Sequence, residues 1–157
     1  MIAAAVGRLP GLHYCRFLAL RSKASAALQR GRHQAAGALG RELIELAEQY
    51  RGDWYYGNAV HHGHLILGRV ALAAGNLRSA RQELLAAGNT PGSPQLNSFG
   101  PNMQLALELL RAGDREVVLE YLTLCRRFWQ FGQPQLDHWT SDVMSGREPA
   151  FGAHLLY

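Results

Sequence analysis

The feature that most constrains the fold is a pattern that occurs twice. The segment from Leu67 to Ala87 aligns with the segment from Leu105 to Cys125 at an offset of 38 residues (105 − 67). Each copy has apolar residues at helical spacing, a glycine followed by Asn or Asp, and a second apolar helical stretch. Apolar residues that recur every three or four positions indicate amphipathic helices, and the glycine suits the turn between them. The pattern therefore predicts a repeated helical hairpin.

The rest of the chain shows the same helical spacing, and no segment alternates with period two for long. We expect helices over residues 13–29, 35–50, 54–74, 77–87, 102–110 and 115–129. Gly31 is expected to close the first of them, and Asp53 is expected to cap the start of the third. The sequence therefore predicts an all-α chain.

Residues 89–101 form the longest stretch without a helical pattern. It contains Pro91, Pro94 and Pro101 together with glycines, so we expect neither helix nor strand there. Two interpretations stay open. Such a loop can bind a ligand; alternatively, Leu96 and Phe99 fill the core while Asn97 and Asn102 cap helix ends.

The length of 157 residues fits one domain or a short repeat array. We expect a ragged N-terminus over 1–12, a helical-hairpin domain over 13–132 and a tail over 133–157. The tail region is rich in apolar residues: Phe131, Trp139, Phe151, Leu155, Leu156 and Tyr157. Because the end of a repeat array exposes apolar surface, we expect the tail to fold back as an irregular cap, with one short helix around 137–144, that buries Trp139 and Phe151. A homodimer contact is the alternative.

Several positions of the first copy resemble the tetratricopeptide repeat. They are Leu67, Gly68, Gly75, Asn76, Ala80, Leu84, Ala87 and Pro91. His64 stands where that family usually has Trp, and Ala71 where it has Tyr. The second copy is degenerate, since Ala106 replaces the glycine and Val118 the alanine. A further hairpin over 14–50 matches loosely.

The chain is also similar, from Asp53 to Asn102 and over 151–157, to a group of bacterial tetratricopeptide-like proteins. The resemblance implies an α-solenoid of about three antiparallel helical hairpins. It implies no particular enzymatic activity.

In the tetratricopeptide family, ligands usually meet the inner face of the first helix of each hairpin. Carried over, this register predicts a concave ligand-binding face made of Tyr55, Asn58, His62, Arg69, Met103 and Arg111, with Asn97 contributed by the Pro/Gly loop. Leu65 and Leu107 stand where the polar residues of a chaperone-binding clamp would be needed, which disfavours that ligand. The mixed polar and apolar face favours a protein or peptide partner.

The alternative function is binding of a metal or small molecule by His61, His62 and His64 with the loop asparagines. His61 and His64 share one face of a helix. No HExxH motif or cysteine pair supplies further ligands, so we expect neither a metal nor another cofactor.

Nothing in the sequence has the pattern of a catalytic centre. Ser98 lies in no GxSxG motif, Cys125 falls on an apolar stripe, and no GxxxxGK[ST] loop occurs. We therefore expect a non-enzymatic protein.

The charge is unevenly distributed. Residues 1–41 carry a local charge of +7 without an acid, and the remainder has 9 arginines against 12 acids. A basic segment suits nucleic acid, but no aromatic residues interleave with the basic ones as base stacking requires, which disfavours such a partner. No apolar run approaches the roughly 20 residues of a membrane span. With Cys15 and Cys125 far apart, the expectation is a reduced, cytoplasmic protein.

Overall fold

The computed structural model describes residues 10–156, and within them it contains helices and no strand. The α-helices are α1 (Pro10–Gln29), α2 (His33–Gln49), α3 (Tyr56–Ala73), α4 (Leu77–Gly88), α5 (Pro94–Phe99), α6 (Gln104–Arg111), α7 (Arg115–Cys125) and α8 (Gln133–Met144). Two short 3₁₀ turns are η1 (Gln130–Gly132) and η2 (Gly152–Leu155). The prediction of an all-α chain is confirmed. Of the predicted ragged N-terminus, residues 1–9 lie outside the described residues, and residues 10–12 belong to α1.

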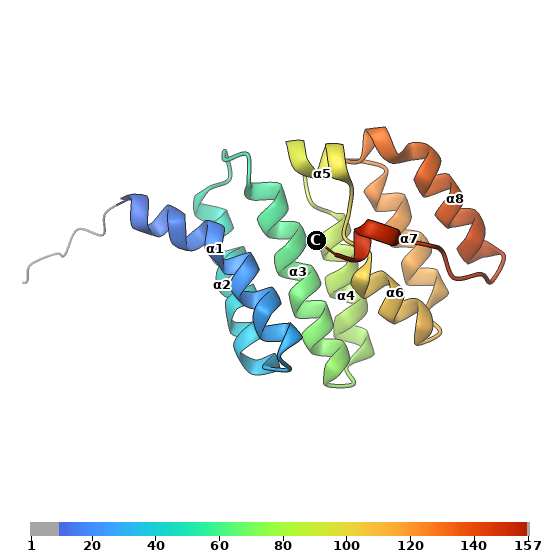
Figure 1. Ribbon diagram of the computed structural model, residues 1–157, viewed down its shortest axis with the longest axis horizontal. Helices are drawn as coiled ribbons and strands as arrows, with labels where there is room; N and C mark the ends of the chain where they lie inside the picture. Colours follow the sequence, from blue (N-terminus) through green and yellow to red (C-terminus); the bar gives the residue numbers. More distant parts are fainter. Residues whose placement is uncertain (1–9, 157) are drawn as a thin grey trace, which may run out of the picture.

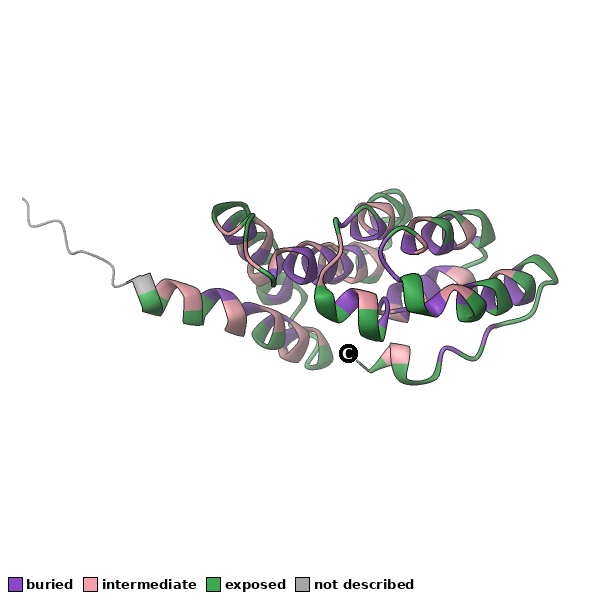
Figure 2. Cartoon of the chain, turned by 90° about the horizontal axis from the view of Figure 1, so that it is seen from above, coloured by how far each residue is buried: buried purple, intermediate pink, exposed green. Residues whose placement is uncertain are grey.

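Neighbouring helices pack side by side along the chain (Figure 1). The contacts are most extensive between α1 and α2, α2 and α3, and α3 and α4, and they continue from α4 to α7 and from α7 to α8. Seen from above, α1 and the C-terminal segment lie on the same side of the other helices (Figure 2). This arrangement encloses one face of α3 between them.

The same hydrogen-bonded turn ends α1, α3, α6 and α8. In each turn, the N–H of a glycine with positive φ donates a hydrogen bond to the carbonyl of the residue three positions earlier. The N–H of the following residue donates to the carbonyl five positions before it. These glycines are Gly31, Gly75, Gly113 and Gly146. For example, the N–H groups of Gly75 and Asn76 lie 2.9 Å from the carbonyl oxygens of Leu72 and Ala71. Glycine is favoured there because a side chain disfavours this backbone conformation.

The residue after the glycine then begins the next helix in two of these turns. The Asn76 side chain accepts a hydrogen bond from the N–H of Ser79, and the Asp114 side chain accepts one from Val117. Each bond satisfies a backbone donor that has no partner within its helix. The Gly-Asn and Gly-Asp pairs of the repeated pattern therefore end one helix and start the next.

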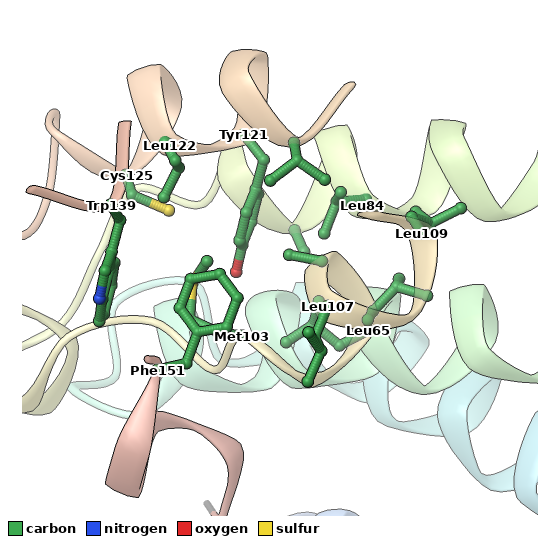
Figure 3. Close-up of a cluster of buried hydrophobic side chains, with 14 of the residues drawn as sticks. Leu65, Leu84, Met103, Leu107, Leu109, Tyr121, Leu122, Cys125, Trp139 and Phe151 are labelled. Carbon is green, nitrogen blue, oxygen red and sulfur yellow. The ribbon is translucent and has the colours of Figure 1, made fainter. Parts of the chain in front are cut away.

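The largest apolar core lies among α3, α4, α6, α7, α8 and the C-terminal segment (Figure 3). Tyr121 and Leu122 of α7 and Met103 before α6 are fully buried in it. A second cluster joins α1, α2 and the start of α3, where the Phe17 ring stacks on that of Tyr50 at 4.9 Å. Both the repeated segments and the first two helices thus contribute apolar faces to the interior.

The tail is more regular than expected, because the helix α8 spans residues 133–144 and begins four residues before the predicted short helix. Pro134 lies in its first turn, where the missing N–H of proline costs no helical hydrogen bond. Trp139 and Phe151 are buried as predicted, and their rings meet edge to face with centroids 5.0 Å apart. Phe131 is not part of this packing, because 77% of it is exposed.

The expectation that residues 89–101 exclude helix is wrong over Pro94–Phe99. Pro94 begins α5, and the Ser93 hydroxyl accepts a hydrogen bond from the N–H of Leu96 at 3.0 Å. Proline is well suited to a first helical turn, so here it starts a helix. Leu96 is buried, as the core-filling interpretation of this loop expects, whereas Phe99 is 66% exposed.

Asp53, expected to cap the third helix, lies two residues before Tyr55, the N-cap residue of α3. Its carboxylate accepts hydrogen bonds from the N–H of Tyr55 at 2.8 Å and from the Tyr14 hydroxyl at 3.0 Å, and α3 begins at Tyr56. Asp53 therefore organises the approach to α3 and links it to α1. None of the helices between residues 10 and 156 has the length and apolar character that a membrane crossing requires.

Candidate functional site

A groove runs along the face of α3 that lies between α1 and the C-terminal segment, and α3 forms its floor. It consists of three adjoining hollows of about 260, 280 and 240 Å³. The first two share Arg21 and His62 in their lining, and the last two share Leu28 and Arg69, so the hollows follow one another along α3. The walls are α1 on one side and α5, the start of α6 and the C-terminal segment on the other. We call this feature the α3 groove.

His62 lies on the floor where the first two hollows join. Only 8% of the residue is exposed, and neither ring nitrogen has a hydrogen-bond partner within residues 10–156. Its ring meets that of His61 edge to face at 5.1 Å. Burial, followed by the proximity of His61 and the positive charge of Arg21, holds the pKa of His62 well below its usual 6.5. The ring is therefore neutral at neutral pH.

Arg21 reaches the same place from α1. The residue is only partly exposed, and no carboxylate in the described part of the chain forms an ion pair with it. Burial lowers the pKa of Arg21, although an arginine remains charged at any physiological pH. Arg21 thus provides a partly desolvated positive charge that faces the α3 groove and has no negative partner within residues 10–156.

Arg69, in contrast, is paired. Its Nε atom lies 3.0 and 3.1 Å from the two carboxylate oxygens of Glu108. The Gln104 side-chain amide also donates to Glu108, at 3.0 Å. This network joins α3 to α6 and neutralises the charge at that end of the groove.

Asn58 closes the opposite end of the groove through contacts with the Pro/Gly loop. Its Oδ1 atom accepts a hydrogen bond from the Ser93 hydroxyl at 2.6 Å, and its amide donates to the side chain of Gln95. Nearby, the Thr90 hydroxyl donates to the carbonyl of Gly57 at 2.8 Å. Asn58 is 2% exposed, and its hydrogen bonds connect α3 to the start of α5. Its polar atoms are used within the protein.

Two of the predicted ligand contacts, Met103 and Tyr55, lie in the interior and outside the lining of the α3 groove. Met103 is fully buried, and its N–H donates to the carbonyl of His154 at 2.8 Å. The C-terminal segment therefore covers it. Tyr55 is 6% exposed and meets the ring of Phe17 at 5.3 Å. The alignment with the tetratricopeptide repeat predicted that both residues lie on the inner, ligand-binding face of the helices. In the structure, α1 and the C-terminal segment pack on that face.

Two further predicted contacts lie outside the groove. Arg111 forms a two-pronged ion pair with Glu148, at 2.7 and 2.9 Å, beside the segment that follows α8. The Oδ1 atom of Asn97 accepts a hydrogen bond from the N–H of Gln130 at 3.3 Å. Neither residue lines the α3 groove. Of the predicted set, the structure brings together Asn58, His62 and Arg69.

The three clustered histidines have different surroundings. The Nδ1 atom of His61 donates to the carbonyl of Ala87 at 3.0 Å, and its Nε2 accepts from the N–H of Asn102 at 3.2 Å. Both nitrogens are thus engaged by backbone, and burial lowers the pKa of His61 to about 4. His64 instead contacts Glu83, at 2.7 Å. Within residues 10–156 no three His, Cys, Asp or Glu side chains are grouped as metal ligands.

The sequence reasoning missed Arg21, Ser25 and Leu28 of α1. They recur at intervals of four and three residues, so they share one face of that helix, and all line the groove. This periodicity was the available signal. Because the hairpin over residues 14–50 matches the tetratricopeptide repeat only loosely, the resemblance predicted no ligand-binding positions on its first helix.

No family model, curated protein or solved structure matches this chain at a significant level. Its function is therefore inferred from the geometry of the α3 groove.

Proposed function

We propose that this chain is a non-enzymatic interaction module, and that it binds a segment of a partner protein in the α3 groove. The observation that carries the proposal is the combination of Arg21 and His62 in one open groove. A buried polar group usually has a partner, and these two have none in the described part of the chain. A ligand that supplies such partners would be bound there with specificity.

The form of the groove favours a peptide over a compact small molecule. The hollows are open and follow one another along α3, with Leu65 and Ile66 bordering the polar groups. An extended or helical segment can place side chains into successive hollows and contact both walls. The proposed peptide-binding function therefore has a revised set of contacts, namely Arg21, Ser25, His62 and Arg69.

We further propose that the helices form a tetratricopeptide-like solenoid, with hairpins α1/α2, α3/α4 and α6/α7. The recurring glycine turn supports this assignment. So does the contact at Gly68, where a Cβ atom would lie 2.3 Å from Cδ2 of Leu105 and 3.5 Å from the carbonyl oxygen of Ala80. A small residue at this position lets the helices approach closely, as the repeat resemblance implies.

A peptide selection tests the binding function. Short random peptides are selected on the intact protein, and their affinities are compared between the wild type and Ser25→Trp, which places a large side chain in the middle hollow. Arg78→Trp, on the exposed face of α4, is the matched control. We expect selected peptides to lose binding to Ser25→Trp alone. Equal binding to both variants would overturn the proposed site.

A further inference from the structure

The environment of Arg21 points to the chemistry of the ligand. Arginine side chains that leave water are usually paired with a carboxylate or phosphate. Arg16, on the same helix, pairs with Glu42, and Arg69 across the groove pairs with Glu108. Arg21 is more enclosed than Arg16 and still has no acidic partner in the described part of the chain. A negatively charged group of a ligand would supply the ion-pair partner of Arg21.

His62 borders the same two hollows as Arg21. Its neutral ring has one N–H donor and one acceptor nitrogen, and neither is used within residues 10–156. A carboxylate held by Arg21 could accept a hydrogen bond from this ring. The negative charge would also favour the protonated imidazolium form, which has two donors.

We propose that Arg21 and His62 form an anchor for a peptide carboxylate in the α3 groove, and that His62 takes up a proton when the carboxylate binds. This inference rests on the proposed peptide-binding function and specifies its ligand. The proton comes from solvent, and the carboxylate stays ionised between the guanidinium and the imidazolium. Binding thus adds one positive charge to the protein and one negative charge from the ligand.

The charges of the groups that face His62 determine whether carboxylate binding raises or lowers its pKa. Arg21 contributes a positive charge from α1, and His61 contributes a neutral ring from α3 itself. The parts of α5 and of the C-terminal segment that line the two hollows contribute no titratable side chain: Gln95, Leu96, Phe99, Leu155 and Leu156. Arg69 lies farther along α3 and is paired with Glu108. Within residues 10–156, therefore, no negative charge faces His62 in the free protein, and the ligand supplies one.

The affinity for the peptide is expected to increase as pH falls. An anion raises the pKa of His62, so the free and bound forms titrate at different pH values. Affinity is constant above the bound pKa and rises as pH falls below it, until the peptide carboxylate itself is protonated. Within that interval it changes by up to about tenfold per pH unit, as expected for uptake of one proton.

NMR titration of the imidazole resonances of the intact protein tests the anchor directly. The probes are sodium acetate, with sodium chloride at matched ionic strength, and three short acetylated peptides of leucine and alanine. One peptide has a free C-terminal carboxylate, one is amidated, and one is amidated with a single internal glutamate. We expect acetate and the acidic peptides to raise the pKa of His62 while that of His61 stays near its free value.

The two carboxylate-bearing peptides distinguish a chain terminus from a side chain as the source of the negative group. A rise in the pKa of His62 with either one supports the anchor. If all three peptides bind equally and the pKa of His62 does not change, the anchor is overturned while the peptide-binding function stands. If acetate raises that pKa but no peptide binds, the anchor stands and the peptide-binding function fails.

Variants supply an independent measurement. We expect Arg21→Gln to weaken binding of the glutamate peptide by about tenfold or more, the scale of a hydrogen bond to a charged group, and to abolish its proton uptake. Arg30→Gln, at an exposed residue directly after α1, is the control with the same charge change. His62→Gln is expected to bind the peptide without proton uptake, so its affinity should not rise as pH falls. Unchanged affinity in Arg21→Gln would overturn the proposal.

Discussion

The Nε2 atom of His61 accepts a hydrogen bond from the backbone N–H of Asn102, over 3.2 Å. Because the opposite ring nitrogen donates to the carbonyl of Ala87, the ring is the neutral tautomer with a proton on Nδ1. One side chain of α3 thereby holds both the end of α4 and the segment that precedes α6. The ring is fully buried, so protonation would place an unpaired charge in the core.

We expect acid to destabilise the protein through His61. Its pKa is about 4 when folded and 6.5 as the reference for the unfolded chain. A depressed folded pKa means that the unfolded state binds the extra proton, so the contribution is complete above pH 6.5 and is lost as pH falls to about 4. The loss is about 3 kcal/mol from this residue alone.

Urea unfolding at a series of pH values across this interval measures the effect. His61→Gln is expected to be less stable throughout, yet its unfolding free energy should change less steeply with pH by about 1.4 kcal/mol per pH unit. Carboxylates and the other histidines titrate in both proteins, so the difference isolates His61. Parallel curves for the two proteins would contradict the assignment.

A close backbone contact joins the start of α3 to the Pro/Gly loop. A Cβ atom on Gly57 would lie 1.8 Å from the carbonyl oxygen of Gly92. Because that oxygen belongs to the backbone and cannot rotate away, we expect Gly57→Ala to reduce the unfolding free energy by about 3 kcal/mol, at the upper end for overpacking. Gly52→Ala is the control, since nothing lies within 4 Å of its Cβ position. Similar values for the two would exclude this contact.

The contact between Gly68 and Leu105 can be measured as a coupling energy. A Cβ atom on Gly68 would lie 2.3 Å from Cδ2 of Leu105, at the end of a side chain that can be shortened. We expect Gly68→Ala to destabilise the wild type but to cost less when Leu105→Ala is already present. The double-mutant cycle should give a coupling of about 1 kcal/mol or more. Strictly additive effects would mean that the residues do not touch.

Replacement of Arg69 should affect stability only modestly. The ion pair of Arg69 with Glu108 is partly exposed, with 34% and 27% of the side chains accessible. Such pairs contribute about 1 kcal/mol or less, so we expect Arg69→Ala to lower the melting temperature by a few degrees at most. If the residue also contacts the ligand, peptide affinity falls by a larger factor. A loss of folding comparable with the loss of binding would make its role structural.

The C-terminal packing offers a paired comparison of two aromatic residues. Trp139 is 1% exposed and contacts Trp129, Phe151 and His154. We expect Trp139→Ala to cost about 3–5 kcal/mol of unfolding free energy, through a cavity in the core. Phe131→Ala should stay within about 0.5 kcal/mol, since its side chain is largely in solvent. Calorimetry of both variants checks the difference, and a small effect at Trp139 would show that α8 caps nothing.

Helices and turns could be predicted because they depend on neighbours in the sequence. The apolar spacing of the segments around Gly75 and Gly113 identified two helical hairpins, and the Asn and Asp after these glycines marked the helix starts. Both signals act over one or two helical turns. Pro94 shows where a local rule misleads, because proline stops a helix in its interior but starts one in its first turn.

The composition of the groove, by contrast, depended on contacts between distant segments. Arg21 and His62 are 41 positions apart (62 − 21), and only the packing of α1 against α3 brings them to one place. Met103 became buried because His154 and its neighbours fold over it, 51 positions later (154 − 103). A helical pattern shows which residues share a face, but which faces are covered is decided by the burial of apolar surface across the whole chain.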